Sequence, residues 1–142
     1  MESASDLRAK PVLPKIDTQP KSVAFDTNML LNIKRFKIDV FEESRRMLGK
    51  VEFMVPIQVM NELEGLEKEG GQLKQEVSIA RQLIEKNNVE IVEVEAQNAD
   101  EALKKLCKQA IIATNDKELK YSIKELNGSI LQLRQRKFLE II

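Results

Sequence analysis

The sequence predicts an α/β fold in which a mostly parallel sheet carries helices on both faces. Short apolar stretches alternate with longer stretches whose apolar residues recur at helical spacing, which gives the order β-α-β-α-β-α-β-α-β. Residues 110–114 read Ala-Ile-Ile-Ala-Thr, which is typical of a strand buried on both faces of a sheet. A chain of 142 residues is long enough for one such domain, expected over residues 22–142.

The expected strands are short, apolar and bounded by polar or turn-forming residues, and they lie at residues 22–25, 51–55, 89–94, 110–114 and 129–133. The expected helices show apolar residues three and four positions apart, at residues 28–33, 39–48, 56–68, 72–86, 99–108 and 117–126. Gly49, the Gly70-Gly71 pair and the Asn127-Gly128 pair favour breaks between elements. Residues 134–142 are expected to form a basic turn and a short apolar tail.

The first residues of the chain show no helical or strand periodicity. Residues 1–21 hold Pro11, Pro14 and Pro20 among scattered charges, so a flexible N-terminal arm is expected. This stretch lacks the apolar centre of a signal peptide, and no apolar run in the chain is long enough to span a bilayer. A single cysteine, Cys107, excludes an internal disulfide. We therefore expect a cytoplasmic protein with no membrane partner.

Composition narrows the chemistry that the chain can perform. There is no histidine, which excludes Ser-His-Asp and Cys-His nucleophilic sites and histidine-ligated zinc. The 23 basic and 23 acidic residues balance, so binding of nucleic acid would depend on local patches. Any catalysis is expected to use carboxylates, whose oxygens suit hard cations such as Mg²⁺ or Mn²⁺.

Four acids are placed differently from the rest. Asp26 ends the strand at 22–25 and Asp116 follows the strand at 110–114, so both are expected at the carboxyl edge of the sheet, where α/β folds bind ligands. If those strands are neighbours, the like charges repel one another unless a cation is present. Glu62 and Asp100 border the buried stripes of their helices, whereas their neighbours Glu64 and Glu101 point outward.

Each of these acids also has an ordinary structural interpretation. Asp26 fits a helix N-cap, and Asp116 fits a first-turn acid beside an Asn115-x-x-Glu118 capping box. Glu62 fits a solvated acidic helix face, and Asp100 fits a partner of a helix dipole. These interpretations leave unexplained why two of the acids end apolar strands and two lie beside buried stripes.

Together the motifs resemble those of PIN-domain nucleases, in order, from residue 22 to the C-terminus. They are Val-Ala-Phe-Asp-Thr-Asn-Met-Leu-Leu at 23–31, Val-Pro-Ile-Gln-Val-Met-Asn-Glu-Leu at 55–63, Asn-Ala-Asp-Glu at 98–101 and Ile-Ala-Thr-Asn-Asp-Lys-Glu-Leu at 112–119. The resemblance is to archaeal PIN proteins and to the related toxin-type and ribosome-processing PIN domains. It implies a three-layer α/β/α fold with a central parallel sheet of about five strands.

The same resemblance implies a function and a set of residues. Asp26, Glu62, Asp100 and Asp116 would bind Mg²⁺ or Mn²⁺ for hydrolysis of RNA, and Asn28 and Thr114 would position the acids. The expected RNA-backbone contacts, which also fit ordinary solvated surface, are Lys34, Arg35, Lys117, Arg134 and Arg136, with Lys37, Lys120 and Lys137 beside them.

The alternatives that remain differ in biological role. One is a non-catalytic RNA-binding or ribosome-assembly scaffold with the same fold. Another is the toxin of a toxin–antitoxin pair in place of an enzyme of rRNA processing. The partner would accordingly be an antitoxin or a ribosome-assembly protein. The apolar stripe at 73–84 fits the core or a subunit contact in a homodimer.

Overall fold

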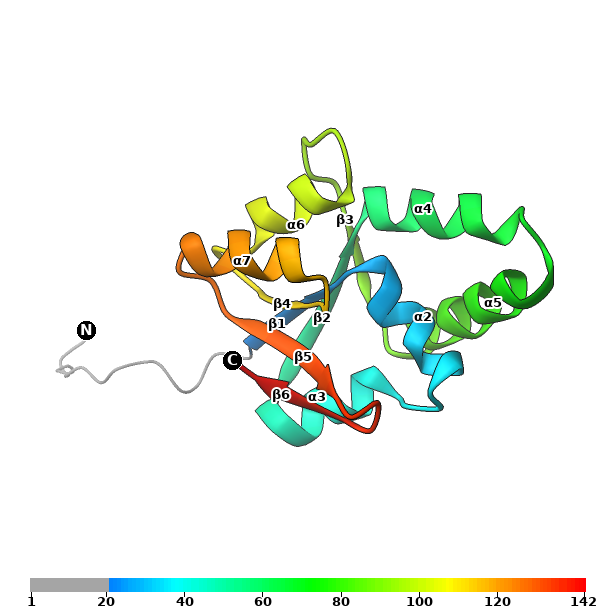
Figure 1. Cartoon of the computed structure of the whole chain (residues 1–142), viewed down its shortest axis with the longest axis horizontal. Helices are drawn as coiled ribbons and strands as arrows, with labels where there is room; N and C mark the ends of the chain where they lie inside the picture. Colours follow the sequence, from blue (N-terminus) through cyan, green and yellow to red (C-terminus); the bar gives the residue numbers. More distant parts are fainter. Residues whose placement is uncertain (1–20) are drawn as a thin grey trace, which may run out of the picture.

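The computed structural model describes residues 21–142, which fold around a six-stranded sheet (Figure 1). Its strands are β1 (Lys21–Phe25), β2 (Val51–Pro56), β3 (Glu90–Val92), β4 (Ile111–Ala113), β5 (Ile130–Arg134) and β6 (Phe138–Ile141). Their order across the sheet is β3-β2-β1-β4-β5-β6. The first five strands run parallel, and β6 pairs antiparallel with β5.

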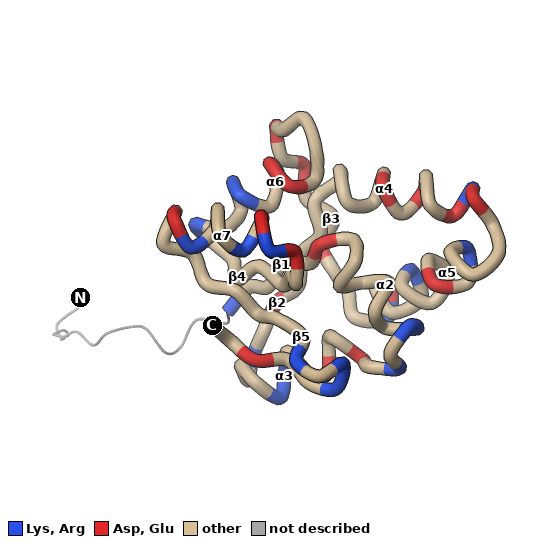
Figure 2. The backbone as a smooth tube through the Cα atoms, viewed as in Figure 1, with Lys and Arg blue, Asp and Glu red and all other residues tan. Residues whose placement is uncertain are grey.

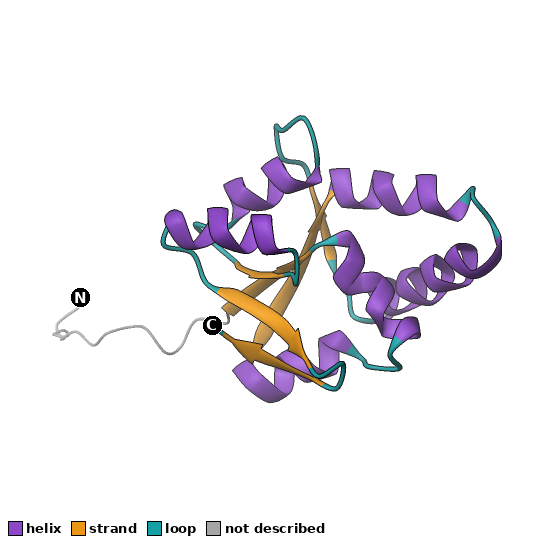
Figure 3. Cartoon of the chain, viewed as in Figure 1, coloured by secondary structure: helices purple, strands orange, loops and turns teal. Residues whose placement is uncertain are grey.

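Helices surround the sheet in the described part of the chain. They are α2 (Thr27–Arg35), α3 (Val40–Leu48), α4 (Ile57–Glu67), α5 (Gly71–Lys86), α6 (Ala99–Leu106) and α7 (Lys117–Glu125). In Figure 3, α6 and α7 lie side by side on one side of the sheet and α3 lies on the other. The helices α2, α4 and α5 pack against one another beyond the carboxyl ends of β1 and β2. Between residues 21 and 142, no helix combines the length and apolar character needed to cross a bilayer.

The core is centred on β1 and β4, which are hydrogen-bonded neighbours. Val23, Ala24 and Phe25 of β1 are fully buried, as are the last two residues of β4. The ring of Phe25 packs against Phe41 of α3 and Phe53 of β2, with ring centroids 4.9 and 5.7 Å away. Burial on both faces holds these strands rigidly, so the residues that follow them start from fixed positions.

The α/β class and the mostly parallel sheet are confirmed, with one correction at the C-terminus. Residues 134–142 were expected to form a turn and a tail, but Phe138–Ile141 is the sixth strand. The turn before it places Gln135 and Arg136 at φ 55° and 57°, a conformation that glycine usually provides and that hides the hairpin in the sequence. Leu139 is fully buried and anchors the strand. The expected N-terminal arm lies outside the described residues, except for Lys21, which begins β1.

Candidate active site

Asp26 lies at the junction between β1 and α2 and is fixed on both carboxylate oxygens. Its main-chain N–H donates to the Ala113 carbonyl, 3.1 Å away, which extends the pairing of β1 with β4. Asp26 is the N-cap of α2, and its Oδ1 accepts from the Met29 N–H at 2.7 Å. The Thr114 hydroxyl donates to Oδ2. The residue is only 8% exposed, so the strand-end acid expected from the sequence is also a buried helix cap.

Burial makes the charge on Asp26 costly. Taken together, its surroundings raise the pKa of this carboxyl from 3.8 to about 6, and removal from water is the largest cause. The hydrogen bonds from Thr114 and Met29 act in the opposite direction and lower the pKa. The negative charges of Asp116 and Asp100 act in the same direction as burial and contribute to the raised pKa. Acids from three separate segments therefore act on one another at this edge of the sheet.

Thr114 joins the two strand-end acids. It is fully buried at the end of β4, and its hydroxyl oxygen accepts from the Asp116 N–H at 3.0 Å while donating to Asp26. Asp116 is the N-cap of α7 and accepts from the Leu119 N–H at 2.9 Å. The capping residue is thus Asp116 and not Asn115. Asn115 instead exchanges two hydrogen bonds with the Leu133 main chain, of 2.9 and 2.7 Å, which continue the contact with β5.

Glu62 and Asp100 approach the same place from helices. Glu62, on α4, is exposed and accepts a hydrogen bond from the Thr27 hydroxyl. Asp100, in the first turn of α6, is also exposed at the surface. Partial burial is the largest cause that raises the pKa of Asp100. The negative charges of Asp116 and Glu118 also raise this pKa, and the positive charge of Lys104 lowers it. Glu62 and Asp100 line one pocket of about 380 Å³, together with Asn98, Ala99, Glu101 and Lys104.

A glutamine that sequence reasoning missed sets the spacing of these two helices. Gln58 lies one turn before Glu62 on α4, and its Nε2 donates to the carbonyls of Val94 and Ala96 at 2.7 and 3.0 Å. Those carbonyls belong to the loop that leads into α6, whose cap is Asn98. The other amide atom, Oε1, is buried and finds no hydrogen-bond partner among residues 21–142. An isolated glutamine on a helix gives no pattern by which the sequence could reveal this role.

Glu118 is a second residue that the sequence analysis did not assign to the site. It lies in the first turn of α7 and raises the pKa of Asp100 on the facing helix. Its position corresponds to that of Asp100 in the first turn of α6, and this shared first-turn position is the signal that could have found it. Asn28 is exposed in the first turn of α2, and its positioning role stays a prediction.

Comparison with known proteins decides the family. The model of the PIN-like domain family matches residues 23–136, which include the four acids. The chain belongs to this PIN-like domain family. It is 35% identical to Ribonuclease VapC4 of Methanocaldococcus jannaschii over 121 residues, which are 82% of this chain and 92% of that protein.

Solved structures agree with the family. The PIN domain endonuclease Utp24 superimposes with a TM-score of 0.71 and 27% identity, over 86% of this chain and 91% of that chain. A domain of a functionally unknown protein from Methanocaldococcus jannaschii matches with a TM-score of 0.56 and 18% identity, over 80% and 91%. The second match concerns the fold alone.

The PIN-like site does not gather its acids as tightly as the sequence analysis expected. Across residues 21–142, no group of three or more histidine, cysteine, aspartate or glutamate side chains is placed to hold a metal ion. The physical reason is visible in the contacts described above. Like charges repel, and Asp26, Asp116 and Glu62 each accept a hydrogen bond from a donor of its own. The chemistry of the donor set nevertheless suits a hard divalent cation, because all four donors are carboxylates.

The expected RNA contacts fall into different environments. Arg35 forms an ion pair with Glu76 of α5, with Nε 2.8 Å from Oε1, and Glu76 is only 2% exposed. Arg134 pairs with Glu140 across the β5–β6 hairpin at 3.2 Å. The Arg136 guanidinium lies over the Phe36 ring, 4.9 Å from its centroid. This contact brings the hairpin close to the end of α2, and Figure 2 shows Lys and Arg in both places.

Proposed function

We propose that this PIN-like chain is a divalent-metal-dependent ribonuclease that hydrolyses RNA phosphodiester bonds. The observation that supports it best is the placement of Asp26 and Asp116 at the ends of the neighbouring strands β1 and β4, where both contact the Thr114 hydroxyl, with Asp100 near enough to raise the pKa of Asp26. The similarity to a ribonuclease and to a PIN domain endonuclease supports the same chemistry. Glu62 completes the proposed metal-binding set.

The acids contribute differently to this mechanism. Mg²⁺ or Mn²⁺, when bound, supplies a more acidic water and stabilises the negative charge on the leaving oxygen. Asp26 offers a buried carboxylate whose orientation is fixed by Met29 and Thr114. Asp116 is oriented by the N-terminus of α7. Glu62 and Asp100 are exposed on α4 and α6 and line one pocket, through which the RNA strand would reach the acids in this proposal.

Basic residues next to the acids hold the RNA backbone in this proposal. Lys117 directly follows Asp116 and is exposed. Lys34 and Lys37 at the end of α2, with Arg136 on the hairpin, lie further from the acids. Arg35 and Arg134 already pair with glutamates, so their positive charge is partly neutralised and their contribution to RNA binding is smaller.

The test is cleavage of a single-stranded RNA by the full chain with Mn²⁺ or Mg²⁺. We expect cleavage that stops in EDTA and that falls at least about 100-fold in Asp26→Asn and Asp116→Asn, because each substitution removes several kcal/mol of charge stabilisation. Glu64→Gln, at an exposed glutamate of α4 that does not line the pocket of Glu62 and Asp100, is the matched control and is expected to retain activity. Full activity of the aspartate variants, or equal cleavage in EDTA, would contradict the proposal.

A non-catalytic RNA-binding or ribosome-assembly scaffold is the alternative, and it is favoured by the finding that no group of three or more acidic, histidine or cysteine side chains among residues 21–142 is placed to hold a metal ion. The two functions differ in Mn²⁺ binding. A ribonuclease binds Mn²⁺ at the acids, and calorimetry would show this binding disappear in Asp26→Asn. A scaffold binds RNA or its partner equally well when Asp26 is neutralised. A small neighbouring gene that encodes an antitoxin would favour the toxin role over rRNA processing.

A further inference from the structure

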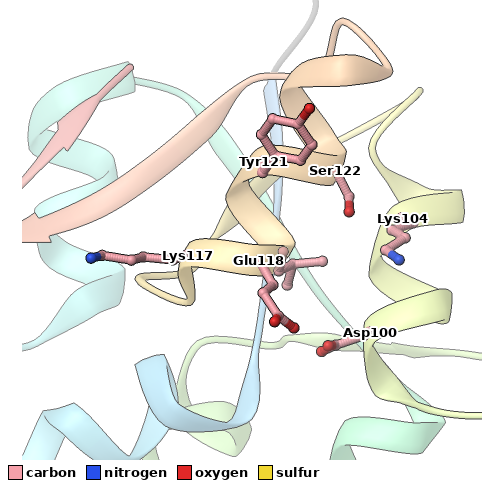
Figure 4. Close-up of a pocket in the computed structure, with 7 residues that line it drawn as sticks. Asp100, Lys104, Lys117, Glu118, Tyr121 and Ser122 are labelled. Carbon is pink, nitrogen blue, oxygen red and sulfur yellow. The ribbon is translucent and has the colours of Figure 1, made fainter.

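A second pocket lies beside the acids, between α6 and α7 (Figure 4). It encloses about 410 Å³ and is lined by Asp100 and Lys104 of α6 and by Lys117, Glu118, Leu119, Tyr121 and Ser122 of α7. Asp100 lines this pocket and also the pocket that holds Glu62. The two pockets therefore meet at a residue of the proposed active site.

The helical repeat builds both walls of this pocket. Asp100 and Lys104 are four residues apart on α6, and Glu118 and Ser122 are four residues apart on α7, so each pair shares a helix face. In Figure 4, Asp100 and Glu118 point toward each other, and Lys104 and Ser122 lie further along their helices. Lys104 lowers the pKa of Asp100 and offsets part of the acidic charge. The walls therefore combine hydrogen-bonding groups of both signs.

Tyr121 gives the pocket an aromatic surface. It is the chain's one tyrosine and is 68% exposed, whereas Phe25 and Phe41 are fully buried in the core. An aromatic ring that remains in water beside a polar pocket offers a face on which a planar base can stack. Stacking of this kind contributes to binding of every base, because each base has a π face.

We infer that the pocket between α6 and α7 is a nucleobase subsite, in which Tyr121 stacks on a base of the RNA next to the cleaved phosphate. This inference rests on the proposed ribonuclease function. Tyr121 comes five residues after Asp116 on α7, about 7.5 Å of helix rise, and it lines the same pocket as Asp100 of the proposed active site. Glu118 and Ser122 offer hydrogen bonds to the edge of the base, and Lys104 and Lys117 lie beside the pocket where the flanking phosphates pass.

The test uses the full chain and single-stranded RNA oligonucleotides in which one abasic nucleotide is moved from position to position. Dissociation constants are measured by fluorescence anisotropy in EDTA, and kcat and KM with Mn²⁺. Tyr121→Ala is expected to weaken RNA binding about 5- to 150-fold and to raise KM with little change in kcat, whereas Tyr121→Phe keeps the ring and the affinity. Leu126→Ala removes another exposed apolar side chain, 46% exposed at the end of α7, and is expected to bind normally.

The decisive result is the coupling between protein and RNA. One abasic position is expected to weaken binding to the wild type and to have no further effect on Tyr121→Ala, because both changes remove the same stacking contact. Equal affinity of the wild type and Tyr121→Ala, or independent effects at every position, would overturn the subsite. If the wild type does not cleave RNA but Tyr121→Ala still loses RNA affinity, the ribonuclease function is overturned, and with it the position next to a cleaved phosphate, whereas base stacking on Tyr121 is supported.

Discussion

The candidate site has a sheet half and a helical half, and they are built differently. In the sheet half, Asp26 and Asp116 follow β1 and β4, and both accept hydrogen bonds from main-chain N–H groups at 2.7 and 2.9 Å. In the helical half, Glu62 and Asp100 lie exposed on α4 and α6. Their spacing depends on side-chain contacts of Thr27 and Gln58.

This difference shows that rigid placement of a carboxylate and a low electrostatic cost are found in different halves of the site. Main-chain donors on buried strands fix the direction of a carboxylate, but burial makes its negative charge unfavourable. Exposed helices hold their acids with little desolvation, and they also hold them less firmly. If a cation draws the acids together, we expect the helical half to move toward the sheet half.

The largest expected effect is on the pH dependence of the unfolding free energy, which reports how much it costs to bury the charged form of Asp26. Its folded pKa, about 6, lies above the unfolded value of 3.8, so the folded state binds more protons between these values. The free energy of unfolding is therefore expected to fall by about 3 kcal/mol as the pH rises from about 4 to about 7, and to lose nothing more from this group above that. Urea unfolding in EDTA, for the wild type and Asp26→Asn, measures the difference, since acids that lie away from Asp26 affect both proteins alike. Parallel pH profiles would contradict the prediction.

The second prediction concerns the hydroxyl that joins the two strand-end acids. Thr114→Val leaves a buried oxygen of Asp26 without a donor and the Asp116 N–H without its acceptor, so we expect a loss of about 2 kcal/mol of unfolding free energy. Because this hydroxyl lowers the pKa of Asp26, the Asp26-dependent pH profile is expected to shift upward. Cleavage is expected to fall about 10- to 100-fold. Thr114→Ser is the control and is expected to behave almost as the wild type in both measurements.

The sheet half was the more predictable from sequence. An apolar strand followed directly by an acid places that acid at the carboxyl edge, and β1 and β4 do pair as neighbours. Helix angles favoured Glu62 over Glu64 and Asp100 over Glu101. Glu62 accepts a hydrogen bond from Thr27, but Glu101 lines the same pocket as Asp100, so the choice of site residues stays a prediction. The catalytic roles of these residues stay predictions.

What sequence could not provide depends on contacts between distant segments. The role of Gln58 follows from where a loop 36 residues later passes its helix, and a local pattern contains no such information. The pairing of β6 was missed because its hairpin turn lacks glycine. The tightness of the acid cluster depends on the mutual position of helix axes and on charge repulsion, which periodicity does not describe.

The third prediction concerns the contact between Gln58, in the helical half of the site, and the loop before α6. Gln58→Leu keeps the size of the side chain and removes both hydrogen bonds to the Val94 and Ala96 carbonyls. We expect a loss of about 1 kcal/mol in unfolding free energy, faster hydrogen exchange in the loop before α6, and Mn²⁺ affinity lower by up to about tenfold. Gln82→Leu, at an exposed glutamine of α5, is the matched control. Unchanged exchange in this loop would show that Gln58 does not hold it.

The smallest effect on stability and cleavage is expected for Thr27→Val, which makes at Thr27 the same change as Thr114→Val. Thr27→Val removes the hydroxyl that donates to Glu62, but Glu62 is exposed, so water replaces the lost donor. The unfolding free energy is expected to change by less than about 1 kcal/mol, and cleavage to fall less than about tenfold. Urea unfolding and cleavage rates of the two valine variants, measured in parallel, give the contrast between the halves directly. A Thr27→Val variant as impaired as Thr114→Val would mean that Glu62 depends on its hydroxyl donor as strongly as buried Asp26 does, and the division into a rigid and an adjustable half would fail.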